Sequence, residues 1–129
     1  MFNYYIYRTY FNAKHSFNGD ITKIHGHSFT VVTYIGMKDS KEDIPFFKLE
    51  AIISSFIDQY RGRYLNELPE FEGCGNTLET IGDYFYEKLR KQFMKSGMEL
   101  YQLDISENPL CVYQVSDRML LPTMNMDTS

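Results

Sequence analysis

The sequence lacks several features that would identify a class of protein. It has no tryptophan, and its 129 residues carry a formal net charge of −4, from 13 basic and 17 acidic side chains. This negative balance argues against a surface that neutralises nucleic-acid phosphates or anionic lipids. No apolar run approaches the length of about 20 residues that a membrane-spanning helix needs. We therefore expect no nucleic-acid partner and no membrane partner.

Cysteine is scarce as well, with only Cys74 and Cys111. Residues 1–11 are apolar, but they lack the basic start, the uninterrupted apolar core and the small-residue cleavage site of a signal peptide. Two cysteines without a secretory signal indicate reduced thiols rather than a disulfide. The sequence therefore predicts a cytoplasmic protein.

The length and composition predict one compact domain. Of the residues, 43% are hydrophobic and 16% are aromatic, enough for a sizeable core. We expect this domain to cover residues 1–118. The tail, residues 119–129, has little to pack against and is predicted to be mobile.

Hydrophobic periodicity predicts an α+β fold with two strands, two helices and two strands in chain order. Residues 12–24 are interpreted as the connection of a hairpin. Cys111 is predicted to begin the last strand as a small core residue. The predicted elements are strands at 2–11 and 25–37, helices at 45–60 and 78–97, and strands at 99–106 and 111–118.

The two helices have apolar stripes at three- and four-residue steps, which predict buried faces. Pro45 suits the first turn of the first helix. Asn76 and Glu79 have the spacing of a capping box before the second helix, and Gly97 suits its end. The stripes are Phe46, Leu49, Ile53, Phe56 and Tyr60 in the first helix, and Leu78, Ile81, Phe85, Leu89 and Phe93 in the second.

All three histidines lie within residues 14–29. In the alternating strand His25 and His27 point to the same side, and His15 joins them if the hairpin folds back. Three neutral imidazoles with an open fourth position are the arrangement of a catalytic zinc. The alternative is that these are ordinary strand and loop histidines with hydrogen-bonded rings.

Five segments of the chain resemble the 6-pyruvoyl-tetrahydropterin synthase / 6-carboxytetrahydropterin synthase family in order and spacing. They are "FNAKH", "IHGHSF", "YLNELP", "NTLETIGDYF" and "ISENP", and the resemblance covers residues 4–118. It implies the tunnelling fold, an antiparallel four-stranded sheet with two helices on one face. It also implies a homo-oligomer, a trimer or hexamer around a central barrel, with a pocket for a small-molecule pterin at the subunit boundary. His15, His25 and His27 would bind zinc.

The same resemblance assigns Glu107 to the carboxylate that anchors the guanidine-like edge of the pterin, and places Thr77 and Glu79 near the pocket. A carboxylate that accepts two parallel N–H donors makes a charge-assisted contact that fixes orientation. The alternatives are a surface turn for Glu107 and a helix-capping role for Glu79.

The chain departs from the family at its acid–base residues. Familiar members act on 7,8-dihydroneopterin triphosphate with a cysteine four residues before His-Gly-His, and with an Asp-His pair before the "YLN"-like stretch. Ile21 stands at the first position, and Arg61 and Gly62 stand at the second. A further variant uses a glutamate just before His-Gly-His, but residues 22–24 hold no carboxylate.

These departures leave two hypotheses open. One is a zinc-dependent lyase with altered chemistry, in which Asp20, a cysteine such as Cys74 or zinc-bound hydroxide is the base. The other is a paralogue that binds zinc and pterin without turnover. Arg61 and Lys23 are candidate anion contacts, although a cation at a helix C-terminus is favourable without any ligand. The queuosine, folate and biopterin pathways share the pterin recognition, so the sequence does not separate them.

Overall fold

The computed structural model describes residues 3–15, 25–39, 43–71 and 77–123, and within these ranges it leaves out the side chains of residues 15, 25–27 and 66. The elements follow the predicted order of two strands, two helices and two strands. Their bounds are β1 (Tyr5–His15), β2 (His25–Met37), α1 (Phe46–Asp58), the short 3₁₀ turns η3 (Leu65–Glu67) and η4 (Pro69–Phe71), α2 (Leu78–Lys95), β3 (Met98–Asn108) and β4 (Cys111–Val115).

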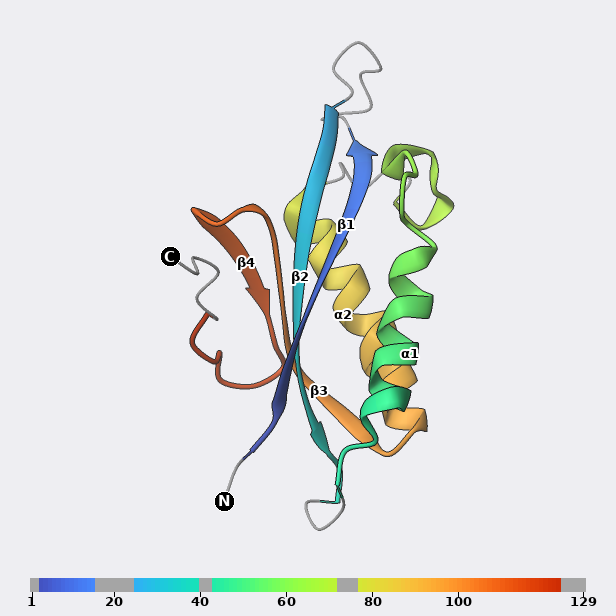
Figure 1. Cartoon of the computed structure of the whole chain (residues 1–129). Helices are drawn as coiled ribbons and strands as arrows, with labels where there is room; N and C mark the ends of the chain where they lie inside the picture. Colours follow the sequence, from blue (N-terminus) through green and yellow to red (C-terminus); the bar gives the residue numbers. More distant parts are fainter. Residues whose placement is uncertain (1–2, 16–24, 40–42, 72–76, 124–129) are drawn as a thin grey trace.

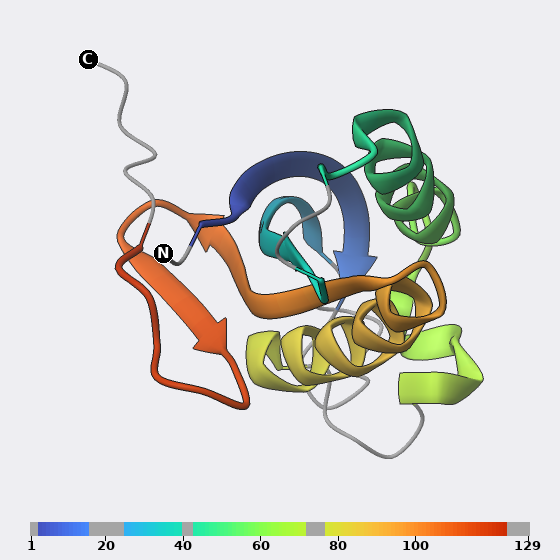
Figure 2. The same cartoon turned by 90° about the horizontal axis from the view of Figure 1, so that it is seen from below.

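The four strands form one antiparallel sheet in the order β1-β2-β3-β4. Both helices lie on the same face of this curved sheet (Figures 1 and 2). The predicted α+β fold is therefore confirmed. Among the described residues, no helix has the length and apolarity needed to cross a membrane.

Strand β1 both begins and ends later than predicted, spanning Tyr5–His15 instead of 2–11. It pairs with β2 along its whole length, from Tyr5 opposite Ile35 to His15 opposite His25. The interpretation of residues 12–15 as part of the connection is wrong, because they pair with β2, and the core-facing alternation continues from Phe11 to Ala13, both 2% exposed.

The core lies between the sheet and the two helices. Both predicted helix stripes are buried there, apart from Phe46, which is 49% exposed, and Leu78, which is partly buried. Phe46 was predicted to be core, but it occupies the first position of α1, where its ring packs against Tyr7 at a centroid distance of 6.3 Å. Gly82 permits close approach of α2, because a Cβ there would lie 2.8 Å from the Tyr113 ring and 2.9 Å from Ile105.

The helix ends differ in detail from the prediction. Thr77 is the N-cap of α2, and its hydroxyl oxygen accepts a hydrogen bond from the Thr80 backbone amide at 3.1 Å. Glu79 is then the second helical residue rather than the third, so the predicted capping box with Asn76 is wrong. Gly97 has a φ of +74° just after the helix, as expected for a terminating glycine.

The far face of the sheet, which is the face without helices, is also partly buried. Val32, Tyr34 and Tyr101 form a small apolar cluster there. A register shift in the β2–β3 pairing at Tyr34/Ile35 brings both Tyr101 and Gln102 to this face.

Two predictions about the C-terminal third are wrong. The tail was expected to have little to pack against, yet Leu121 and Pro122 accept hydrogen bonds from side chains of the sheet, while its predicted mobility stays a prediction. Cys111 begins β4 as predicted, but its side chain is exposed, because it pairs with Asn108 beyond the end of the core. Residues 124–129 lie outside the described residues.

Candidate functional site

The three histidine positions meet at one end of the β1–β2 hairpin. The ladder pairs His15 with His25 and His27 with Ala13, and it continues to Phe11 opposite Phe29 in the core. Directly paired residues of an antiparallel ladder lie on the same face, with Cα atoms about 4.5–5.5 Å apart. The backbone arrangement that the predicted metal site requires is therefore present.

Metal binding by these histidines stays a prediction, since their side chains lie outside the described set. Among the side chains that the structure does describe, no group of three or more histidine, cysteine, aspartate or glutamate residues is placed to hold a metal ion.

The segment after α1 runs along the outer edge of β1 beside this end. The Gly62 amide donates to the Asn12 carbonyl at 2.6 Å, and the Lys14 amide donates to the Arg63 carbonyl at 2.9 Å. Lys14 also forms a parallel bridge with Tyr64. Gly62 has a φ of +70°, a conformation that favours glycine. Arg61 and Gly62, at the positions where the family that the chain resembles keeps Asp-His, thus lie in the segment that pairs with Asn12 and Lys14, next to His15 in the chain.

The Arg61 guanidinium has two partners within the chain. Its Nε donates to Asp58 Oδ1 at 2.6 Å, and its Nη1 donates to the Tyr10 carbonyl at 2.8 Å. The side chain remains 47% exposed. Arg61 therefore connects the end of α1 to β1 through hydrogen bonds. An anion that binds Arg61 would have to share the guanidinium with Asp58.

Glu107 lies at the same end of the sheet as the histidines. It follows Ser106, whose partner Thr30 is close along β2 to His27, and its side chain is half-buried. Thr77 is at the N-terminus of α2, with its hydroxyl used in capping, and Glu79 is exposed in the first helical turn. Glu107 lies at the register shift of the β3–β4 pairing, between the paired residues Ser106 and Asn108.

A pair that sequence reasoning missed joins β4 to α2. The Tyr113 hydroxyl donates to Asp83 Oδ1 at 2.6 Å. This hydrogen bond, together with burial and the negative charges of Asp83 and Glu79, raises the pKa of Tyr113 to about 12. The one sequence signal was Gly82, a glycine inside a helical pattern, which indicates a close packing contact.

Three of the predicted site residues cannot be placed. Asp20, Lys23 and Cys74 lie outside the described residues. Their roles as a base or as an anion contact therefore stay predictions.

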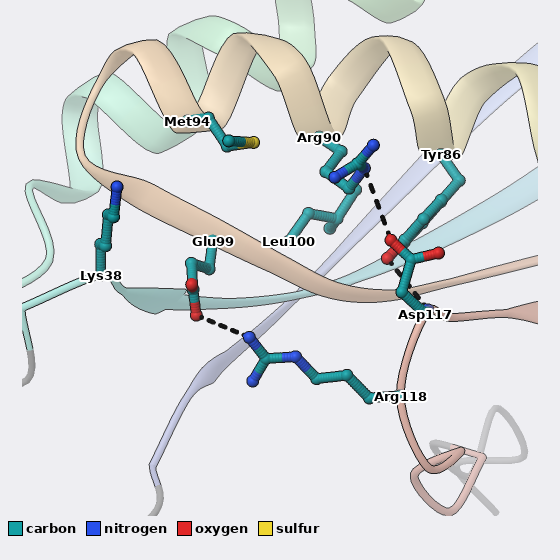
Figure 3. A pocket seen from close by; sticks show the side chains of 8 residues that line it. All are labelled: Lys38, Tyr86, Arg90, Met94, Glu99, Leu100, Asp117 and Arg118. Atoms are coloured by element: carbon teal, nitrogen blue, oxygen red, sulfur yellow. Dashed lines mark hydrogen bonds and ion pairs between the residues drawn. The ribbon is translucent and has the colours of Figure 1, made fainter.

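A pocket of about 240 Å³ lies at the opposite end of the sheet, where β2 ends and β3 begins (Figure 3). Its charged groups are largely paired with one another. Arg118 Nη2 is 3.1 Å from Glu99 Oε2, and Arg90 Nε is 3.7 Å from Asp117 Oδ2. None of the predicted site residues lines this pocket, so we do not assign the pterin to it.

Known proteins agree with this fold. Residues 5–118 match the family model described as 6-pyruvoyl tetrahydropterin synthase. No curated protein sequence matches the chain. The Caenorhabditis elegans 6-pyruvoyl tetrahydropterin synthase structure aligns with a TM-score of 0.72 at 21% identity, over 90% of this chain and 96% of that one. The Plasmodium falciparum 6-pyruvoyl tetrahydropterin synthase structure aligns with a TM-score of 0.61 at 15% identity, over 88% and 96% of the two chains.

The four-stranded antiparallel sheet with two helices on one face is the fold of the 6-pyruvoyl tetrahydropterin synthase structures, a pterin-related lyase fold. The match over residues 5–118 covers most of the chain, so the chain belongs to the 6-pyruvoyl tetrahydropterin synthase family. The structural likenesses, at 21% identity and below, show the fold alone.

Proposed function

We propose that the chain is a zinc-dependent lyase of the pterin side chain that works with altered acid–base residues. The substrate would be 7,8-dihydroneopterin triphosphate or a related pterin. The observation that carries the proposal is the pairing of His15 with His25, and of His27 with Ala13, at one end of the hairpin of a family member. The cytoplasm is the proposed location.

The residues present fit a zinc ion. Three imidazoles leave a fourth position open for a water or a substrate, as in catalytic rather than structural zinc sites. The register supports this donor set, because the three positions share one face of two neighbouring strands. Bound there, zinc would polarise a side-chain hydroxyl of the pterin and lower its pKa.

Glu107 would hold the pterin ring. Its carboxylate would accept two N–H groups from the guanidine-like edge, which fixes the ring and so presents the side chain to the histidines. Its place after Ser106, at the histidine end of the sheet, supports this role. Thr77 and Glu79 at the start of α2 would line the same pocket.

Arg61 and Lys23 would hold the phosphates. A guanidinium binds phosphate through parallel N–H groups and cannot act as a base near neutral pH. Arg61 and Gly62, in place of the family's Asp-His pair, would thus provide anion binding instead of proton transfer. Because Asp58 already contacts Arg61 at 2.6 Å, this role requires the phosphate to share or displace that carboxylate.

The proton acceptor is unassigned, with Asp20 and Cys74 as candidates. A general base contributes about 10²–10⁴-fold to a rate, so its replacement is compatible with slow turnover. The second candidate function, a paralogue that binds zinc and pterin without turnover, is favoured by the same substitutions at Ile21, Arg61 and Gly62.

We further propose that the chain works as a homo-oligomer, most simply a hexamer, with the pocket at the subunit boundary. The edge strand β1 supports this, since Tyr5 and Tyr10 are 55% and 57% exposed in the single chain. An exposed apolar edge strand is an aggregation hazard unless a neighbour covers it. Light scattering at micromolar concentration should give a closed oligomer, and a monodisperse monomer would count against this assembly.

The experiment that tests the function is to incubate the zinc-loaded protein with 7,8-dihydroneopterin triphosphate and identify products by mass spectrometry. Loss of triphosphate together with a changed side chain, abolished in His27→Ala, is the result expected of a lyase. Binding of the pterin without product supports the paralogue. If the protein neither binds the pterin nor forms a product, both candidate functions are contradicted.

A further inference from the structure

The far face of the sheet holds a buried polar cluster that the proposed chemistry does not use. Asp104 and Gln102 are both 0% exposed, in the middle of β3. Asp104 accepts hydrogen bonds from the Tyr34 hydroxyl at 2.6 Å and from Gln102 Nε2 at 2.8 Å, and a longer one from Gln114 Nε2 at 3.4 Å. A buried carboxylate is costly unless it is paired in this way.

Residues 121–123, which we call the strap, lie over this cluster and bind it mainly through their backbone. The Leu121 amide donates to Gln102 Oε1 at 2.6 Å, and Gln102 Nε2 donates back to the Leu121 carbonyl at 3.2 Å. Gln114 Nε2 donates to the same carbonyl at 3.1 Å and to Thr123 Oγ1 at 2.9 Å. The Gln102 amide group is thereby fully satisfied, and the strap is the partner that allows it to be buried.

Two donors of the cluster are shared between Asp104 and the strap. The Tyr34 hydroxyl has one proton but two acceptors in reach, Asp104 Oδ2 at 2.6 Å and the Pro122 carbonyl at 3.3 Å. Gln114 Nε2 has two protons but three acceptors, since Asp104 Oδ2 joins the two strap oxygens. An ionised Asp104 therefore competes with the strap for protons.

Protonation of Asp104 removes this competition. A proton on Oδ2 can be donated to the Tyr34 oxygen, which frees the Tyr34 proton for the Pro122 carbonyl. The Gln114 protons are then both free for Leu121 and Thr123. We propose that the far face is a docking surface for the strap, and that the protonation state of Asp104 sets how firmly the strap is held.

Among the described residues, two titratable or charged side chains flank Asp104 on neighbouring strands. Tyr34 on β2 contacts it directly, and Arg8 lies on β1 in the same cross-strand row, separated from Asp104 by Val32. Tyr101 and Tyr4 pack in the apolar cluster beside Tyr34. Burial raises the pKa of Asp104 above its ordinary range, although the bonds from Tyr34, Gln102 and Gln114 lower it.

The sign of the linkage follows from this raised pKa. Asp104 is fully buried while the strap is bound to its hydrogen-bond partners Tyr34, Gln102 and Gln114, which favours the protonated form, and we expect release of the strap to hydrate the carboxylate. Docking is therefore firmest below the pKa of the hydrated carboxyl, and it weakens as the pH rises through the pKa of the docked state. Each pKa unit between the two states corresponds to a tenfold change in the docking constant.

The test is amide hydrogen exchange at Leu121 in the full chain from about pH 3, below the ordinary pKa of an aspartic acid, to about pH 8, divided by the rate of a synthetic peptide of residues 119–129. Protection should fall as pH rises in the natural chain. In Asp104→Asn, whose amide mimics the protonated acid toward Tyr34, protection should stay high and nearly independent of pH. A flat profile in the natural chain, or the natural slope in Asp104→Asn, would overturn the proposal.

A second variant covers the case in which Asp104→Asn does not fold. Tyr34→Phe removes the shared hydroxyl while keeping the buried ring, so Leu121 protection at the acid end of the profile, where Asp104 is protonated, should fall about two- to tenfold, as expected for one lost hydrogen bond. Circular dichroism would report whether the sheet is retained. Unchanged protection at the acid end would contradict the shared role of the Tyr34 hydroxyl.

Discussion

The two faces of the sheet are built on different physical principles. The helix-facing side is apolar, with Phe29, Val31 and Ile35 of β2 in one core cluster with residues of both helices. The far face buries a carboxylate and a carboxamide under a three-residue strap. Apolar burial is non-directional and tolerates small shifts, whereas the buried polar cluster needs every partner in place. We therefore expect the first face to determine stability and the second to respond to conditions.

The largest effect should come from the helix-facing side. Phe85 is 0% exposed, and its ring lies 5.8, 5.0 and 4.9 Å from the ring centroids of Phe11, Phe56 and Tyr60. Phe85→Ala should lower the free energy of unfolding by about 3–5 kcal/mol, because it leaves a cavity in a packed aromatic cluster. Chemical denaturation measures this loss. The matched change Phe47→Ala, at a side chain that is 85% exposed, should stay within about 0.5 kcal/mol.

A matched pair of substitutions compares the faces directly. Tyr34 on the far face is 0% exposed and Tyr60 on the helix side is 2% exposed, and both donate to carboxylates, at 2.6 Å to Asp104 and 3.2 Å to Glu70. Tyr34→Phe should cost about 1–3 kcal/mol of stability, because Asp104 is buried and loses its shortest hydrogen bond.

Tyr60→Phe should cost about 0.5–1.5 kcal/mol, since the half-buried Glu70 can bind water instead. Thermal or chemical unfolding of both variants gives the comparison. Equal costs would mean that the far-face cluster is no more demanding than an ordinary hydrogen bond.

The smallest effect is expected at Arg61, on the rim where the end of α1 meets β1. Arg61→Ala removes an exposed ion pair with Asp58 and a hydrogen bond to Tyr10, and should cost about 0–1 kcal/mol of stability. Under the phosphate role, it should weaken binding of a triphosphorylated pterin far more than binding of the unphosphorylated pterin, with zinc content unchanged. Calorimetric titration of both ligands measures the difference. Equal loss for both, or no loss for either, would leave Arg61 with its structural role alone.

Local patterns account for what the sequence predicted correctly. The order of elements, the bounds of β2 and most of both helix stripes depend on alternation or on three- and four-residue steps, which the sequence displays directly. The extension of β1 to His15 was missed because "NAKH" is not an apolar run, although Ala13 continues the buried alternation. At α2 the Asn76–Glu79 spacing favoured Asn76 as the N-cap, although the N-cap is Thr77 and threonine also caps helices.

The far face was not predicted, for a different reason. Tyr34 bonds Asp104 at a separation of 70 residues and Pro122 at a separation of 88, and no local period reports such contacts. The candidate site was predicted only in part. The proximity of His15 to His25 and His27 follows from pairing the two strands as a hairpin, which the sequence predicts. The Tyr113–Asp83 pair depends on packing of β4 against α2, which leaves no local sequence pattern.

The most direct test of the proposed metal site is the zinc content of the purified protein, measured by mass spectrometry of the element after dialysis without added metal. The three histidine positions at the hairpin end predict close to one zinc per chain in the natural protein and loss of most of it in His27→Ala. A matched change on the same strand, Ser28→Ala, alters an exposed residue that bonds Asn12 and should keep the metal. Full retention of zinc in His27→Ala would contradict the site.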